Sequence, residues 1–377
     1  MIRQTVAHVD LGALAHNARV IRAFMAAHRG DAVPGLVGVV KANAYGHGAV
    51  EAARTLVASG AAVLACADIE EGLDLRQAGL TVPILVFGAF SLGDLDGLVD
   101  GRLTPTVSTP TAARRLQEAA ARRGVRLRYH LGIDTGMHRL GLRHDNLART
   151  MPEILGAPNL ELAGVYTHFA SADEPGSELF ARQQRNFEAA DRALAALGAE
   201  GYVRHAANSA ALLADSSSWF DMVRPGLLIY GVAPPAFEGR VDVKPVMSLR
   251  SRVAAVKGVR AGESIGYGGR FVARRPTTMA IVPAGYADGL DTRLEGRGAV
   301  LVRGRRVPIV GAVSMDMIAL DVTGVAVEPG DEVVLTGRQG NEEITFGDMS
   351  RWVSTIPYEL LCRVGSRVER VYLPPAP

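Results

Sequence analysis

The sequence predicts an α/β protein, with an N-terminal (β/α)8 TIM barrel over residues 1–240 and a C-terminal mainly-β domain over residues 241–377. The chain has 377 residues, which exceeds the size at which one hydrophobic core usually stops growing. Up to residue 240, short β-branched runs alternate with longer amphipathic segments, as in βα units around a parallel sheet. Beyond it, strand-like runs are broken by glycine, which is typical of antiparallel β structure.

Eight apolar runs are predicted to be the barrel strands: Val37–Val40, Val63–Ala67, Ile84–Phe87, Thr104–Ser108, Leu127–Leu131, Leu162–His168, Val203–Ala207 and Leu227–Tyr230. Between them, Pro110–Arg123 and Leu179–Leu197 repeat their apolar positions at helical spacing. A first helix is predicted after an N-cap at Asp10. Its apolar face would consist of Leu11, Leu14, Ala18, Ile21 and Met25.

The second domain is predicted from strand-like runs that glycine-containing turns separate. These runs are Ala280–Val282, Val300–Val302, Pro308–Val310, Ile318–Val322 and Glu332–Leu335. Such a pattern favours an antiparallel sheet.

Composition and charge exclude several functional classes. The net charge of +2 comes from 41 basic and 39 acidic residues, which are interspersed, so neither nucleic acid nor a charged membrane is an expected partner. Cys66 and Cys362 are the two cysteines, and their separation fits neither a disulfide scaffold nor a metal site. The N-terminus lacks the apolar core of a signal peptide, which predicts a cytoplasmic protein.

Lys41 follows the apolar run that ends at Val40, and barrels of this kind carry their working residues at the carboxyl ends of strands. Partial desolvation there lowers the pKa of an amine and favours its bonding to an aldehyde. A single lysine at a strand end more often only extends to solvent. The small residues of segment 42–48, which we expect to be a loop, would let a ligand approach the backbone.

The stretch VVKANAYGHG at residues 39–48 resembles the cofactor-binding segment of alanine racemases, which are fold-type III enzymes that use pyridoxal 5'-phosphate (PLP). Further blocks that resemble this family follow in family order along almost the whole chain. They are HLGIDTGMHRLG at 130–141, GVYTHFASAD at 164–173, ANSAA at 207–211, VRPGLLIYG at 223–231, SIGYGGRF at 264–271, PAGYADG at 283–289, VGAVSMDM at 310–317 and TIPYE at 355–359.

The resemblance implies two catalytic bases. Lys41 would hold PLP covalently and remove the α-proton of the D isomer, and Tyr267 would act on the opposite face, for the L isomer. Two bases are needed because a proton leaves one face of a planar carbanion and arrives at the other. Tyrosine has a pKa of about 10, so Tyr267 would need a polar or cationic neighbourhood to act as a base. The resemblance implies that His168 and Arg224 supply it.

The resemblance also implies the residues that bind the cofactor. Tyr45, Ser209, Tyr358 and the backbone of Gly226 and Leu227 would hold the phosphate. Arg139 would bind the phenolic oxygen of PLP and the substrate, and Arg224 would face the pyridine nitrogen. A permanently charged donor leaves that nitrogen without its own proton, which makes the ring a weaker electron sink.

Four side chains of the second domain are implied at the substrate. Met315 and Asp316 would shape the pocket for the substrate carboxylate and methyl group, and Tyr286 would stand at its entrance. In the family these three and Tyr267 come from the neighbouring subunit, which implies a homodimer with shared sites. No metal is implied.

One position departs from the family pattern. Many members carry a carbamylated lysine where this chain has Gly132, which has no side chain to carry a carbamate. Arg139 would lose its anionic partner, and an unpaired, partly buried guanidinium is costly. A bound anion such as chloride, or water, is the expected replacement.

The resemblance implies an isomerase that interconverts L- and D-alanine and supplies D-alanine for peptidoglycan. Three alternatives remain open: a broad-specificity or serine racemase of the same fold, a non-catalytic PLP-binding barrel of cofactor homeostasis, and a fold-type III decarboxylase of basic amino acids. The predicted β domain, with Tyr267 and Met315–Asp316, disfavours the second of these. Cys362 matches no catalytic cysteine motif, which disfavours the third.

Overall fold

A computed structural model describes residues 4–30, 32–88 and 95–374, which form two compact units. The barrel unit comprises Leu14–Ala44 and Ala49–Val243. The β unit comprises Met1–Ala13, Tyr45–Gly48 and Lys244–Pro377. Within the described ranges, no helix has the length and apolarity that crossing a membrane requires.

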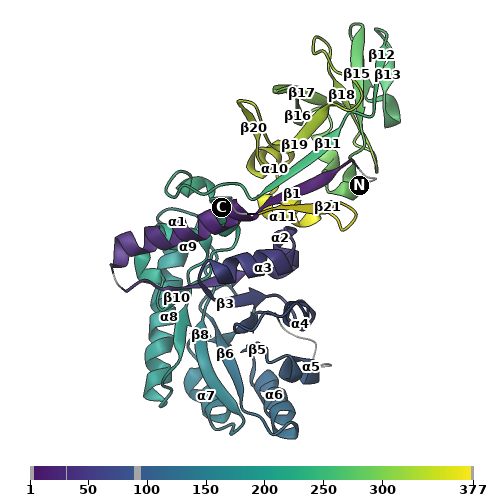
Figure 1. Cartoon of the computed structure of the whole chain (residues 1–377). Helices are drawn as coiled ribbons and strands as arrows, with labels where there is room; N and C mark the ends of the chain where they lie inside the picture. The colour runs from purple at the N-terminus through teal and green to yellow at the C-terminus, as the bar shows by residue number, and fades with distance from the viewer. Residues whose placement is uncertain (1–3, 31, 89–94, 375–377) are drawn as a thin grey trace. The chain divides into compact units, whose positions relative to one another are not determined.

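The barrel unit is a closed parallel sheet with helices on its outside (Figure 1). Eight strands follow one another around the barrel, and the circle closes because β10 pairs with β2. These strands are β2 (Gly35–Val39), β3 (Ala61–Cys66), β4 (Ile84–Val86), β5 (Thr104–Val107), β6 (Leu127–Asp134), β8 (Leu160–Tyr166), β9 (Val203–His205) and β10 (Met222–Val223). A short strand, β7 (Leu142–Arg143), extends β6. Val37, Ala65, Leu85 and Met222 are buried against one another as one layer of the core.

The barrel prediction is confirmed, with one strand misplaced. Seven predicted runs lie on the observed strands β2 to β6, β8 and β9. The prediction of an eighth strand at Leu227–Tyr230 is wrong, because this run is a 3₁₀ turn, labelled η2, and the eighth strand is Met222–Val223. All four side chains of Leu227–Tyr230 are buried, and burial alone makes a short apolar run look like a core strand.

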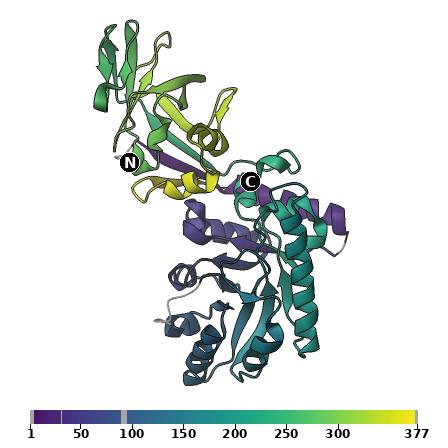
Figure 2. The same ribbon diagram turned by 180° about the vertical axis from the view of Figure 1, so that it is seen from behind.

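The helices begin where local capping dictates. Asp10 caps the first helix through a 2.8 Å bond from Ala13 N, and every residue of the predicted apolar face is buried. Thr109 and Ser177 cap two further helices in the same way. Figure 2 shows the long helix α8 along the outside of the barrel. The helices are α1 (Leu11–Arg29), α3 (Ala49–Ala58), α4 (Ile69–Gln77), α5 (Leu95–Asp100), α6 (Pro110–Arg122), α7 (Leu147–Leu155), α8 (Glu178–Ala196), α9 (Ser209–Ala214), η1 (Ser216–Ser218) and η3 (Pro235–Phe237).

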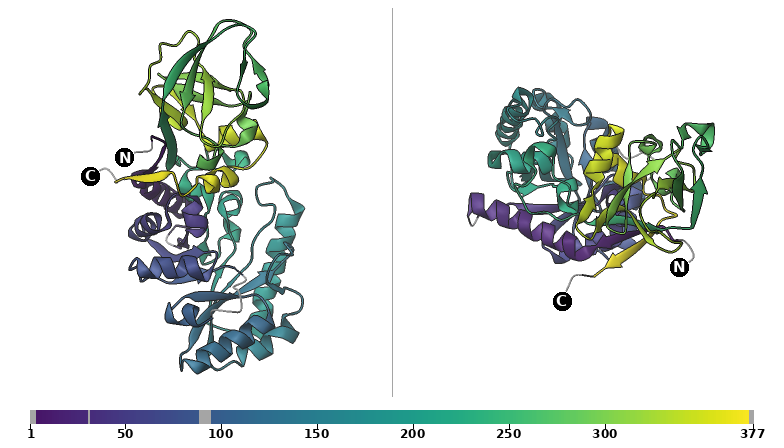
Figure 3. Two further views of the ribbon diagram at one scale, coloured as in Figure 1. Left: turned by 90° about the vertical axis from the view of Figure 1, so that its right-hand side faces the viewer. Right: turned by 90° about the horizontal axis from the view of Figure 1, so that it is seen from above.

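The β unit is a ten-stranded, mostly antiparallel sheet with two short helices, and Figure 3 shows it from two further sides. All five strand-like runs predicted for the second domain lie on observed strands. Its strands are β1 (Val6–Asp10), β11 (Met247–Arg252), β12 (Ala255–Val259), β15 (Thr277–Val282), β16 (Ala299–Val302), β17 (Arg305–Val310), β18 (Ile318–Asp321), β19 (Glu332–Gln339), β20 (Glu342–Ile344) and β21 (Glu369–Leu373), beside the ribbon of β13 (Ser264–Ile265) and β14 (Phe271–Val272). The helical segments are η4 (Tyr267–Gly269), η5 (Tyr286–Asp288), η6 (Thr292–Leu294), α10 (Phe346–Val353) and α11 (Pro357–Arg363).

The first strand of the chain lies in the β unit. β1 pairs antiparallel with β11 and parallel with β21, so it is held between two strands of the C-terminal half. The observed units therefore differ from the predicted domains at the N-terminus, where residues before Leu14 were expected in the barrel.

Candidate active site

Lys41 lies just beyond the carboxyl end of β2 and is partly buried. Two bonds fix the backbone that leads to it. Val40 N donates to Ala65 O over 2.8 Å, and the buried Tyr230 hydroxyl donates to Val39 O over 2.8 Å. The predicted position of Lys41, at a strand end of the barrel, is confirmed.

The segment after Lys41, labelled α2 (Lys41–Tyr45) in Figure 1, is a left-handed turn rather than the expected loop. Ala42, Asn43, Ala44 and Tyr45 have φ angles of 51°, 53°, 54° and 52°. Ala42, Ala44 and Tyr45 each cost roughly 1–2 kcal/mol in this conformation, which asparagine tolerates better, so the turn stores roughly 3–6 kcal/mol. Strain of this size persists only where surrounding contacts hold it, and it is concentrated at functional sites.

A buried chain of side chains runs through the barrel unit from Arg224 to His130. Arg224 is 4% exposed, and its guanidinium donates to His205 Nδ1 at 2.9 Å and to Thr167 O at 2.7 Å. His205 Nε2 lies 2.8 Å from His130 Nδ1. Arginine only donates, so His205 accepts at Nδ1, carries its proton on Nε2 and donates it to His130. The ring of His130 has room because residue 164 is glycine: a Cβ there would lie 2.6 Å from it.

Arg224 also approaches His168, whose Nδ1 lies 3.4 Å from Nη2. Tyr166 stacks on His205 with ring centroids 5.0 Å apart, and the Arg224 guanidinium lies 5.2 Å from the centroid of Tyr166. Burial lowers the pKa of Arg224 to about 10, so it stays charged at neutral pH. The sequence-based pairing of His168 with Arg224 is present in the barrel unit.

The pKa of His168 reveals which charges surround it. Burial first, and then the positive charges of Arg224, Arg139 and Lys41, lower this pKa to about 3. Three cationic side chains near one neutral histidine form a site for an anionic group. PLP carries a phosphate and a phenolic oxygen, so this donor set fits it.

Because three histidines of the barrel unit have lowered pKa values, we expect acid to destabilise this unit. Burial lowers the pKa of His130 to about 4 and that of His168 to about 3, and it lowers the pKa of His205 well below its usual value. Below about pH 6.5 the unfolded chain therefore binds protons that the folded chain does not, and each histidine costs up to about 1.4 kcal/mol per pH unit. We expect the melting temperature, followed by circular dichroism, to fall between about pH 7.5 and 5.5.

Matched variants separate this effect from general acid sensitivity. His130→Asn removes one proton-linked group, so its melting temperature should depend less steeply on pH. His28→Gln, which replaces an exposed histidine of α1, should leave the slope unchanged. A wild-type melting temperature that is constant over this range would contradict the prediction.

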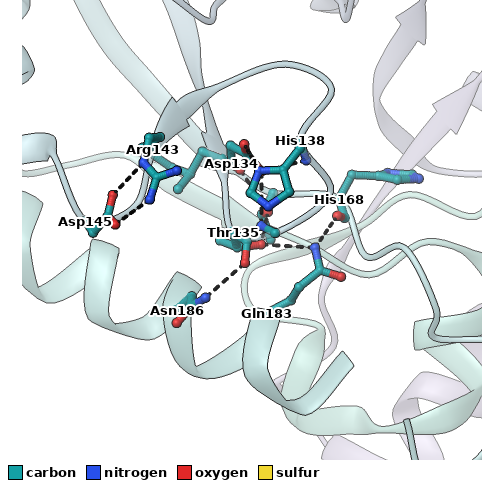
Figure 4. A network of polar contacts seen from close by, with 11 residues as sticks. Asp134, Thr135, His138, Arg143, Asp145, His168, Gln183 and Asn186 are labelled. Carbon is teal, nitrogen blue, oxygen red and sulfur yellow. Dashed lines mark hydrogen bonds and ion pairs between the residues drawn. The ribbon is translucent and has the colours of Figure 1, made fainter. Parts of the chain in front are cut away.

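The backbone of His168 is held from the outer helix α8 (Figure 4). Gln183, a fully buried residue of this helix, donates from Nε2 to His168 O at 2.9 Å and accepts from Ala170 N at 2.9 Å. Asn186, one turn later, donates to Thr135 O at 2.9 Å. The two bonds of Gln183 fix the turn that carries His168.

Gly132 lies inside β6, and the phenol of Tyr166 stands beside it. A Cβ at Gly132 would lie 3.6 Å from Tyr166 Oη, which is bonded to Thr106 Oγ1 at 3.2 Å. Arg139 is exposed in the single chain, so the expectation that it is partly buried is wrong for the chain alone. Among the described residues, no carboxylate lies within ion-pair distance of Arg139.

Ser209 is bonded to the backbone segment, Gly226 and Leu227, that was predicted to bind phosphate with it. It is the first residue of α9 and accepts from Gly226 N at 2.9 Å and from Leu228 N at 3.2 Å. Because both bonds end on its oxygen, the Ser209 hydroxyl keeps its own proton to donate. Leu227 begins η2 directly after Gly226.

The remaining predicted site residues belong to the β unit. Tyr45 and Tyr358 meet edge to face, with ring centroids 5.8 Å apart. Tyr267, on η4, is 77% exposed, and Met315 and Tyr286 are 51% and 45% exposed. Large exposed side chains of this kind mark contact surfaces.

Arg367 ties the segment of Tyr286 to that of Met315 and Asp316. Its guanidinium binds both oxygens of the fully buried Asp288, at 2.9 and 3.0 Å. It also donates to Asp316 Oδ1 at 2.8 Å and to Met315 O at 3.1 Å. Gly285 allows the approach, since a Cβ there would lie 2.3 Å from Met315 O. The segments that carry Tyr286, Met315 and Asp316 therefore lie side by side in the β unit.

Several supporting residues escaped sequence reasoning. Gln183 left a signal, because it interrupts the apolar face of the Leu179–Leu197 helix. His130 and His205 lie inside predicted strands, where a histidine alone does not reveal its partner. Arg367 left no signal, since its three partners are distant in sequence. No group of three or more His, Cys, Asp or Glu in the described ranges is arranged to hold a metal ion.

Comparison with known proteins gives consistent family matches. Residues 9–234 match the family described as alanine racemase, N-terminal domain, and residues 246–372 match alanine racemase, C-terminal domain. The alanine racemase of Carboxydothermus hydrogenoformans is 42% identical over 376 residues, which cover 99% of this chain and 100% of that protein.

Solved structures agree with these matches over the whole chain. The alanine racemase from D-cycloserine-producing Streptomyces lavendulae has a TM-score of 0.94 and 36% identity, covering 99% of this chain and 98% of that one. The alanine racemase of Bartonella henselae, solved with covalently bound pyridoxal phosphate, has a TM-score of 0.87 and 29% identity, covering 98% and 99%.

Proposed function

Because this chain belongs to the alanine racemase family, we propose that it interconverts L- and D-alanine with PLP as its cofactor. In a bacterial host the D-alanine would supply peptidoglycan synthesis in the cytoplasm. The observation that carries the proposal is the placement of Lys41 at the carboxyl end of β2, close enough to Arg224 and Arg139 that all three lower the pKa of His168. The Lys41 amine therefore lies near two guanidinium groups that could bind an anionic cofactor.

The residues of the barrel unit divide the tasks of holding the cofactor. Lys41 would anchor it, Ser209 would donate to its phosphate, and Arg224 would face its pyridine nitrogen. When bound, PLP supplies the electron sink that acidifies the α-proton of an amino acid. Arg224 keeps its proton at neutral pH, so it would leave the ring nitrogen unprotonated and would limit how much charge the ring withdraws.

Two proton-transfer groups act on opposite faces of the substrate. Lys41 holds or releases the proton on the face of the D isomer, and the Tyr267 phenol does so on the face of the L isomer. Tyr45 and Tyr358 would bind the phosphate, and Tyr286, Met315 and Asp316 would line the substrate pocket. Arg367 keeps the last three in one rigid group.

We also propose a homodimer in which each site receives side chains from the partner subunit. The support is the exposure of Tyr267, Tyr286 and Met315 in the single chain, since large side chains that are exposed together mark contact surfaces. Tyr267 is set between Gly266 and Gly268, both with positive φ, so its turn is defined although its side chain extends into solvent.

An amino-acid panel in heavy water tests the function. Purified protein with PLP is incubated with each enantiomer of alanine, serine and lysine, and α-proton exchange is followed by NMR and stereochemistry by optical rotation. We expect exchange and inversion fastest with both enantiomers of alanine. Faster turnover of serine would establish the broader racemase, carbon dioxide release from lysine the decarboxylase, and PLP binding without exchange the homeostasis protein.

We propose that an anion occupies the space between Gly132 and Arg139. The support is the absence, within the described part of the chain, of a carboxylate near Arg139, together with Gly132, which has no side chain where the family resemblance implies a carbamylated lysine. A crystal soaked in bromide should show an anomalous peak beside Arg139. A side chain of the dimer that forms an ion pair with Arg139 would overturn the proposal.

A further inference from the structure

We propose that Glu71 is a positioning residue for Lys41, because its carboxylate holds the first amide of the left-handed turn that follows the lysine. This inference rests on the proposed function, in which Lys41 anchors the cofactor. Glu71 Oε1 accepts from Ala42 N at 2.6 Å, and Ala42 is the residue directly after Lys41.

The carboxylate joins the ends of two neighbouring barrel strands. Its second oxygen accepts from Ala67 N at 2.8 Å, and Ala67 follows β3. β2 and β3 pair in parallel, so Lys41 and Ala67 leave the barrel at the same end. One side chain therefore ties the lysine turn to the adjacent strand end.

The sequence around Glu71 resembles a local capping motif, yet the contacts are different. Asp68 caps α4 by accepting from Glu71 N at 2.9 Å, and Glu71 is the third helical residue. In a capping box this glutamate would accept from the backbone of the N-cap residue itself. Here its oxygens serve Ala67 and Ala42 instead, so the bond to the lysine turn is additional to helix capping.

The strain of the turn explains why such a bond is needed. Four consecutive residues with positive φ relax towards ordinary backbone angles unless their amides are held. Ala44 N bonds to Val40 O at 2.8 Å, and Ala49 N bonds to the Asn43 side chain at 2.8 Å. Ala42 N, beside Lys41, is held by Glu71. Without this bond the peptide group after Lys41 would be free to rotate, and the backbone of the lysine would be held less firmly on that side.

The test compares Glu71→Leu and Glu71→Gln with Glu70→Leu, a matched change at the exposed residue before Glu71 on the same helix. Hydrogen exchange of the peptide that covers residues 42–46 is measured by mass spectrometry in the cofactor-free protein. The dissociation constant for PLP is measured separately by spectral titration.

We expect Glu71→Leu to speed exchange of this peptide by at least about tenfold and to weaken PLP binding by roughly 10–100-fold, as for the loss of a charge-assisted bond. Glu71→Gln should fall between wild type and Glu71→Leu, since an amide oxygen can still accept from one N–H. Glu70→Leu should match wild type, and peptides of α8 should exchange unchanged in all variants if the barrel is folded.

Two results would overturn the inference. One is unchanged protection of residues 42–46 in Glu71→Leu. The other is faster exchange in that variant with PLP affinity equal to that of Glu70→Leu, which would leave Glu71 a purely structural role. If the wild-type protein failed to bind PLP, the proposed function would fail, while the exchange experiment would still report on the turn.

Discussion

Replacement of Lys41 by alanine should lower racemisation of alanine by at least about 10³-fold and remove the absorbance band of lysine-bound PLP. The reason is that this side chain has two tasks in the proposed function, as the covalent anchor of the cofactor and as one of two proton-transfer groups, and loss of a proton-transfer group alone costs about 10²–10⁴-fold. The spectrum is recorded after addition of PLP, and racemisation is followed by polarimetry.

The chain has few lysines, so the site where the cofactor attaches can be identified directly. The chain contains only Lys41, Lys244 and Lys257, so reduction with borohydride followed by peptide mass spectrometry assigns the attachment site without ambiguity. We expect the cofactor mass on the peptide with Lys41. Lys257→Ala, at an exposed position of β12, is the control and should keep band and rate. Attachment at another lysine, or a persistent band in Lys41→Ala, would refute the role.

The position of Lys41 could be predicted because it depends on a repeating pattern. Alternation of apolar runs and amphipathic helices determines where strands end, and the working end of a barrel is the carboxyl end. The first helix shows the same logic: a cap at Asp10 and five apolar positions at helical spacing become one buried face. Patterns that involve many residues are therefore predictable from sequence.

The turn after Lys41 could not be predicted, because its backbone contradicts local preference. Ala42, Ala44 and Tyr45 are residues that seldom adopt positive φ, and no glycine marks the left-handed region until Gly46. The conformation is imposed by distant groups such as the Glu71 carboxylate. Local propensity fails here because tertiary contacts outweigh it.

The last barrel strand is too short to be recognised from a sequence pattern. Met222–Val223 is two residues long, and it pairs with Gly35, Leu36 and His205. Two residues carry too little periodicity to stand out beside the four buried residues of Leu227–Tyr230. Arg224 follows this short strand, and bonds to the His205 side chain and the Thr167 backbone hold it in place.

The buried network of histidines around Arg224 could also be predicted only in part. The presence of His168 and Arg224 was expected, but the extension through His205 to His130 depends on which residues face one another inside the closed barrel. β6, β8 and β9 are adjacent in the sheet, which brings these rings together. Sequence order alone does not give the facing of side chains across three strands.

Replacement of Tyr267 by phenylalanine should separate proton exchange from inversion. The phenol is the proposed proton-transfer group on the face of the L isomer, so removal of its hydroxyl should slow α-proton exchange of L-alanine by about 10²–10⁴-fold. Exchange of D-alanine, which depends on Lys41, should continue with retention of configuration. Racemisation should fall in both directions, because inversion needs a group on each face.

The measurement is NMR of the α-proton of each enantiomer in heavy water, together with the cofactor spectrum. Tyr202→Phe, which removes a phenol that bonds to Asp191 in the barrel unit, is the matched control and should behave as wild type. The Tyr267→Phe variant keeps an aromatic ring and its apolar contacts, so PLP should remain bound. Equal slowing of exchange for both enantiomers, or slowing that follows loss of PLP, would show that Tyr267 is no base.

Mixed subunits test whether the tyrosine acts across the proposed dimer. Tyr267 is 77% exposed in the single chain, so its side chain is free to enter a neighbouring subunit. If each site takes its tyrosine from the partner, a dimer of one Tyr267→Phe subunit and one Lys41→Ala subunit contains one site with both proton-transfer groups intact. Mixing the two inactive variants should then restore part of the activity, whereas a tyrosine that acts within its own subunit would leave the mixture inactive.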